Sequence, residues 1–119
     1  AGEPAFLSDQ ADAQLPQNLK DIIGLMENNM EEMLSAEEIA SLVGITRRQI
    51  ERQFQRYLGS TPTRYYLELR LKRCHQLLTQ THLSMSDISL ACGFVSYPHF
   101  SKCYRQYFEV TPSHTRRQS

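Results

Sequence analysis

The chain has 119 residues, of which 40% are hydrophobic, which is enough for one small domain or for two very small ones that share an interface. No apolar run approaches the roughly 18 residues of a membrane helix, and residues 1–16 lack the features of a signal peptide, so we expect a soluble protein in the cytoplasm. Three cysteines are too few for a disulfide scaffold and suit a reducing compartment.

The formal net charge is zero, but the charges are unevenly distributed along the chain. Residues 1–45 hold one basic and nine acidic residues, whereas residues 46–119 hold twelve basic and four acidic ones. A basic segment of that size is typical of a protein that binds the phosphate backbone of nucleic acid. Basic residues are also common on any solvated helix face, so charge alone does not identify the partner.

Helical periodicity runs through most of the chain after a polar stretch at 1–16, which we interpret as a flexible linker or tail. We expect helices over about 17–32, 36–43, 47–58, 62–79, 86–92 and 97–108, and a final short helix from Pro112. Their boundaries are marked by capping residues and glycines, namely Ser35 with Glu38, Thr46, Ser84 or Ser86, Ser96, Gly44, Gly59 and Gly93. No alternating segment appears, so the prediction is an all-α fold with about seven helices.

Apolar residues at helical spacing define the faces that we expect to be buried. They are Leu19, Ile22, Ile23, Met26 and Met30, then Ile39, Leu42 and Val43, then Ile50, Phe54, Tyr57 and Leu58, then Leu67, Leu71, Cys74 and Leu78, then Phe100, Tyr104 and Tyr107 or Phe108. Four basic residues of the long helix lie off its apolar stripe, namely Arg64, Arg70, Lys72 and Arg73. For the last three, phosphate contact and simple solvation remain equally open.

The chain repeats itself at a period of about 50 residues. Residues 39–45 correspond to 88–94 at an offset of 49, and after a one-residue insertion Thr46 corresponds to Ser96 at an offset of 50. Each copy has a short apolar helix, a glycine turn, a capping hydroxyl and a longer helix with outward basic residues. This pattern predicts two helix-turn-helix subdomains, at 17–61 and 81–119, joined by a long linking helix at 62–80.

The second helix of each copy should present its first turns to base edges in the major groove of double-stranded DNA. In the first copy Arg48 and Arg52 can bind guanine through two hydrogen bonds, and Glu51 can accept one from cytosine. The second copy exposes Tyr97, Pro98, His99, Ser101, Lys102 and Arg105. The second copy has fewer side chains than the first that can donate two hydrogen bonds to one base. We therefore expect more phosphate and apolar contact there.

Phosphate contact is expected from residues that flank these positions, namely Arg47, Gln55, Arg56, Arg73, Ser96, His99 and Arg105. A linking helix of about 18 residues spans about 27 Å, whereas successive major-groove faces are about 34 Å apart. With the width of the subdomains added, one chain can place two recognition helices in successive major grooves. Bending of the DNA would absorb any mismatch.

Residues 20–116 resemble the DNA-binding domain of the AraC/XylS family of bacterial transcription regulators. The resemblance is carried most strongly by the sequence DISLACGF at 87–94, then by Ser96, by HFSK at 99–102, by Tyr104 and Arg105, and by VTP at 110–112. The segment 62–71 is similar to a subgroup whose N-terminal half, absent from this chain, looks like a glutamine-amidotransferase or DJ-1-like sensing domain. That subgroup senses amino acids or quaternary amines.

The resemblance implies base contacts from Arg48, Glu51 and Arg52 in the first copy, and from Tyr97, Pro98 and Lys102 in the second. It also implies activation of transcription through RNA polymerase, with repression left open. Two positions depart from the family pattern. Glu109 stands where glycine is common, and Thr115 stands where an aromatic residue precedes the final Arg116, so the end of the second copy is expected to be looser than usual.

Other classes of function find less support. No Gly-rich phosphate loop, nucleophile elbow or apolar carboxylate pair appears, so we expect neither an enzyme nor a cofactor. Cys92, His99 and Cys103 invite a metal site, but the repeat places both cysteines in the core, so no metal is expected. RNA is disfavoured because recognition helices do not fit its deep, narrow groove. The alternative that stays open is a helical protein-interaction module that uses the acidic first helix and binds no DNA.

Overall fold

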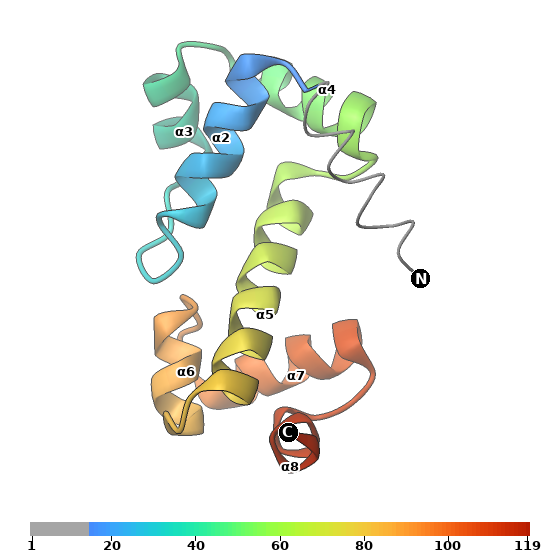
Figure 1. The fold of residues 1–119 in the computed structure, drawn as a ribbon. Helices are drawn as coiled ribbons and strands as arrows, with labels where there is room; N and C mark the ends of the chain where they lie inside the picture. Colours follow the sequence, from blue (N-terminus) through green and yellow to red (C-terminus); the bar gives the residue numbers. More distant parts are fainter. Residues whose placement is uncertain (1–14) are drawn as a thin grey trace. The chain divides into compact units, whose positions relative to one another are not determined.

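A computed structural model describes residues 15–119, and within these residues the fold contains seven helices and no strand, which confirms the predicted all-α class (Figure 1). The helices are α2 (Gln17–Glu27), α3 (Ala36–Val43), α4 (Arg47–Leu58), α5 (Pro62–Gln80), α6 (Met85–Ala91), α7 (Tyr97–Phe108) and α8 (Pro112–Gln118). Most of the predicted tail at 1–16 lies outside the described residues. None of these helices is long and apolar enough to cross a membrane.

The chain forms two compact units. The first contains Leu34–Thr63 and, of the described residues, also 15–28. The second contains Asn29–Met33 and Arg64–Ser119, so α5 belongs to the second unit from Arg64 onward. Each unit therefore holds one of the two helix-turn-helix copies.

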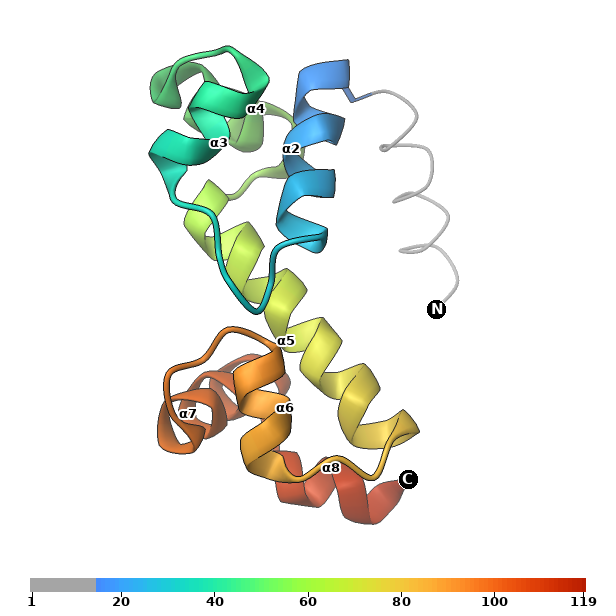
Figure 2. The ribbon, with the colours of Figure 1, turned by 90° about the vertical axis from the view of Figure 1, so that its left-hand side faces the viewer.

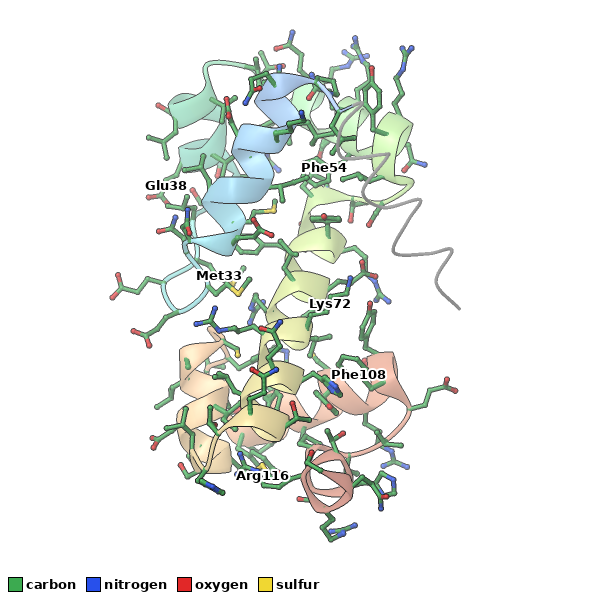
Figure 3. All side chains as sticks on the ribbon, viewed as in Figure 1. Met33, Glu38, Phe54, Lys72, Phe108 and Arg116 are labelled. Carbon is green, nitrogen blue, oxygen red and sulfur yellow. The ribbon has the colours of Figure 1, made fainter. Side chains whose placement is uncertain are left out.

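Helices α2, α3 and α4 pack around a small apolar core in the first unit. The buried residues are Leu15, Leu19, Ile22, Met26, Ile39, Ile50 and Phe54, the last of which is labelled in Figure 3. Two residues predicted to be buried are not, because Leu42 is 64% and Tyr57 is 39% exposed. The eight-residue α3 buries only Ile39 fully.

The core of the second unit is formed by α5, α6 and α7. It consists of Leu71, Cys74, Leu78, Ile88, Cys92, Phe94, Phe100 and Tyr104. Tyr104 is buried, and its hydroxyl lies 2.8 Å from Thr115 Oγ1 and 3.1 Å from His75 Nδ1. Burial raises the pKa of Tyr104 above its ordinary value. Thr115, one of the two departures from the family pattern, therefore completes a buried hydrogen-bonded network.

Arg116 ties α8 to the end of α5 (Figure 3). Its guanidinium donates to the carbonyl oxygens of Leu78 at 3.2 Å, Thr81 at 3.1 Å and Leu83 at 2.5 Å. The last carbonyls of a helix have no partner within the helix, so a cation that donates to them stabilises its end. Arg116 is thus a structural residue of the second unit.

Helix α2 ends at Glu27, five residues before the predicted end at 32. Asn28 donates its N–H to the carbonyl of Gly24 at 3.0 Å, and the chain then leaves the helix. The following carbonyl, of Asn29, accepts a hydrogen bond from the Tyr66 hydroxyl of α5. Figure 2 shows this connection, in cyan, running beside α5. The prediction of helix at 28–32 was wrong, and residues 29–33 instead belong to the second unit, where Asn29 is bonded to Tyr66.

Candidate nucleic-acid interface

The two helix-turn-helix copies share the backbone hydrogen bond that spans the turn, whereas the N–H of the turn glycine donates to Ala40 in the first copy and to Leu90, one residue nearer, in the second. Ile45 N–H donates to the carbonyl of Ala40 at 3.2 Å, and Phe94 N–H donates to that of Ser89 at 2.9 Å. We call Ile45 and Phe94, the apolar residues that follow the turn glycines, the plug residues. Gly44 and Gly93, which precede them, each have a φ of 80°. This left-handed conformation ends the first helix and lets the second one start at a steep angle.

Each recognition helix begins at a hydroxyl residue that caps it. The Thr46 side chain accepts from the backbone N–H of Gln49 at 3.1 Å, and the Ser96 side chain accepts from that of His99 at 3.3 Å. The helices α4 and α7 each have 12 residues. The repeat found in the sequence is therefore also present in the caps, turns and lengths of the two recognition helices.

On α4 the three predicted base-contact residues lie together on the exposed side. Ile50 and Phe54 face the core, which leaves Arg48, Glu51 and Arg52 in solvent. These three side chains line one hollow of about 630 Å³ in the first unit. It is completed by Met26, Ala36, Ile39, Arg47, Ile50, Gln55, Ser60, Thr61, Pro62 and Thr63. The hollow thus combines long hydrogen-bonding side chains with an apolar floor.

Two of the predicted phosphate contacts on α4 already have partners. Arg47 Nη1 donates to Glu37 Oε1 of α3 at 2.8 Å, and both side chains are exposed. The Arg56 guanidinium lies over the ring of Tyr57, 5.5 Å from its centroid. Glu37 could not be singled out from the sequence, because its partner is ten residues away and belongs to another helix.

On α7 the predicted contacts differ in their exposure. Pro98, Lys102 and Arg105 are exposed. Tyr97 is half-buried, since its ring packs against Phe100 with centroids 6.0 Å apart. The exposed part of α7 therefore carries the two cations Lys102 and Arg105. Arg105 is the one exposed arginine of α7, whereas α4 exposes several arginines, each of which can donate two hydrogen bonds to one base.

His99 is exposed and has neighbours within its own unit. Its ring and the Phe94 ring pack in a T-shaped arrangement with centroids 5.5 Å apart, and its Nε2 lies 3.6 Å from Cys103 Sγ. Cys92, the third residue that invited a metal site, is buried in the core. Across residues 15–119, no group of three or more His, Cys, Asp or Glu residues is arranged to hold a metal ion.

Arg70 is buried and bonded within its own unit, so the prediction of either phosphate contact or simple solvation was wrong for it. It is 8% exposed, and it donates to the carbonyl oxygens of Cys92 and Gly93 at 2.8 and 2.9 Å. Burial lowers the pKa of its guanidinium. Lys72, labelled in Figure 3, and Arg73 lie on the same helix and are exposed. Helical spacing alone did not separate Arg70 from them, because its acceptors lie 22 and 23 residues away.

Known proteins share both the sequence and the fold. Residues 39–118 match the helix-turn-helix domain family. In Pseudomonas aeruginosa, the HTH-type transcriptional regulator GbdR is 52% identical over 99 residues, which are 83% of this chain and 27% of that protein. The regulator ArgR of the same bacterium is 54% identical over 94 residues, 79% of this chain and 29% of that protein. The chain thus spans less than a third of the length of these regulators.

A crystal structure of a transcriptional regulator with an AraC-type DNA-binding domain, from Chromobacterium violaceum, has a TM-score of 0.85 and 53% identity to this chain. The match covers 91% of this chain and 95% of the other. The sequence match to the helix-turn-helix family covers more than half of the chain. The chain therefore belongs to the AraC-type helix-turn-helix DNA-binding domain family.

Proposed function

We propose that this chain reads operator DNA for a bacterial transcriptional regulator, with one recognition helix from each unit in the major groove. The observation that carries the proposal is the set of Arg48, Glu51 and Arg52, exposed together on α4 behind a helix-turn-helix turn that the second unit repeats. Arginine pairs with guanine through two hydrogen bonds, and glutamate accepts from cytosine. These three residues would supply most of the sequence preference.

The second unit would add affinity and a smaller share of the specificity. Lys102 and Arg105 are exposed cations on α7, and Pro98 offers an apolar contact to a thymine methyl group. Phosphate contacts would come from Arg47, Gln55, Arg56, Arg73, Ser96, His99 and Arg105. They hold the protein in register on the duplex and carry no sequence information themselves.

The regulator as a whole would act in the cytoplasm, where a sensing domain joined to this one would respond to an amino acid or a quaternary amine. Activation through RNA polymerase and repression remain two modes of the same proposal. Support comes from the similarity to GbdR and ArgR, since both are named as HTH-type transcriptional regulators.

Selection from a random pool of double-stranded DNA tests this function. We expect an enriched site with two blocks, and an affinity that falls steeply as salt rises, because binding to phosphates releases counterions. Arg52→Ala should change the preference in one block and Lys102→Ala in the other. Absence of enrichment at any salt concentration would contradict the proposal and favour a helical protein-interaction module.

A further inference from the structure

The turn of the second helix-turn-helix is held by a side chain that lies outside it. Arg70 of α5 donates from Nε to the Cys92 carbonyl at 2.8 Å and from Nη2 to the Gly93 carbonyl at 2.9 Å. Its guanidinium carbon also lies 4.1 Å from the centroid of the Phe94 ring. Arg70 thus contacts three consecutive residues, and the chain reaches the cap of α7 at Ser96 two residues later.

The same turn is also contacted by the segment that follows α2. The hydroxyl of Tyr66, one turn before Arg70 on α5, donates to the Asn29 carbonyl. The next carbonyl, of Met30, lies so close to Gly93 that a Cβ on residue 93 would stand 2.1 Å from its oxygen. We call Arg70, Tyr66, Asn29 and Met30 the turn clasp.

The first helix-turn-helix has an equivalent turn without such a close neighbour. Gly44 has the same φ of 80° as Gly93, yet a Cβ on Gly44 would meet nothing within 4 Å. The glycine and the plug residue therefore suffice to make the turn. The turn clasp is therefore an addition at the second copy.

We propose that Arg70 is a positioning residue for DNA reading, which fixes where α7 begins and thereby sets the sequence preference of the second unit without touching DNA. This inference rests on the proposed function. Hydrogen bonds to base edges require narrow distances and angles, so a small displacement of the α7 start weakens them. The planar guanidinium holds two neighbouring carbonyls in a fixed geometry, which a lysine ammonium does not reproduce.

The test compares Arg70→Lys with Lys72→Arg, which keeps the charge at an exposed position on the same helix. Affinity is measured for the selected site and for two probes, each with one block scrambled. Arg52→Ala and Lys102→Ala identify which block each unit reads. We expect Arg70→Lys to reduce discrimination at the block read by α7 by about tenfold, the size of one good base contact, and to leave the other block unchanged.

Two results on these probes would overturn the inference. One is unchanged discrimination at both blocks in Arg70→Lys. The other is an equal loss on all probes and on random DNA, as expected for a phosphate contact. If Arg70→Lys is unfolded at the assay temperature, Tyr66→Phe decides on the same probes, because it removes only the hydroxyl that holds Asn29.

A measurement without DNA separates this inference from the proposed function. Backbone amide spectra of Arg70→Lys should show shifts at residues 97–102, in the first turns of α7, that Lys72→Arg does not show. Shifts confined to α5 and to the contacted residues 92–94 would overturn the positioning role. This readout applies even if the unaltered protein enriches no DNA sequence.

Discussion

Gly93 and the carbonyl of Met30 are in such close contact that no side chain fits between them. A Cβ at residue 93 would lie 2.1 Å from the Met30 oxygen, which is a backbone atom, and 3.4 Å from Arg70 Nε. Real Cβ atoms do not approach a backbone oxygen so closely, so a larger residue at position 93 forces the chain to move. This contact joins the segment after α2 to the turn before α7.

Gly93→Ala should therefore lower the free energy of unfolding much more than Gly44→Ala. Both glycines have a φ of 80°, so each substitution carries about 1–2 kcal/mol of left-handed strain. Only Gly93→Ala adds the clash with Met30, which we expect to cost at least about 2 kcal/mol more. Urea denaturation of the two variants measures the difference, and equal losses would show that the contact is not present in solution.

Glu109→Gly should stabilise the second unit by about 0.5–1 kcal/mol. Glu109 ends α7 with a φ of 64°, and it is the only non-glycine residue among 15–119 with a positive φ. Glycine removes the steric cost of this conformation, although it makes the unfolded chain more flexible. Thermal or urea denaturation tests this. Glu109→Ala is the control, because it removes the charge but keeps a Cβ and should bring no comparable gain.

Arg52→Ala should cost about 1–3 kcal/mol of binding to the selected site and should relax the preference at one base pair. Arg73→Ala should weaken binding to specific and random DNA alike and reduce the salt dependence by about one counterion. Both side chains are exposed, so neither change should alter the fold. Affinities on matched and random duplexes at two salt concentrations measure this. If Arg52→Ala loses as much on random DNA, Arg52 does not read a base.

Glu37→Gln should raise the affinity for all DNA sequences about two- to fivefold at low salt. Glu37 holds Arg47 Nη1 at 2.8 Å, and in such an exposed pair the carboxylate competes with phosphate for the arginine by up to about 1 kcal/mol. Glutamine keeps the size of the side chain and removes the charge. Fluorescence anisotropy on specific and random duplexes tests the effect, with the exposed Glu38→Gln of the same helix as a control for general charge. An equal rise in both variants would assign the effect to net charge and not to the ion pair.

The local sequence determined the helices, the caps and the two-copy architecture. Ser35, Thr46, Ser84, Ser96 and Thr111 each cap the helix that follows, because a side-chain oxygen accepts an N–H within the next three residues. Glycine turns act over equally short distances. These interactions depend on neighbours in the chain, so the order of residues alone was enough to predict them, and the repeat then predicted the two helix-turn-helix units.

Contacts between residues far apart in the chain account for the features that helical periodicity did not predict. Arg70 and Arg73 look alike on a helix, but only Arg70 meets the carbonyls at the turn before α7. Helix α2 ends at Glu27, and the carbonyl of Asn29 just beyond it accepts a hydrogen bond from the Tyr66 hydroxyl, 37 residues away in the chain. A buried polar group needs a partner, and only the folded chain supplies partners from so far along the sequence. The sequence alone thus determined which helices form and most of the side chains that they expose, while the tertiary structure decided which arginines hold the fold together.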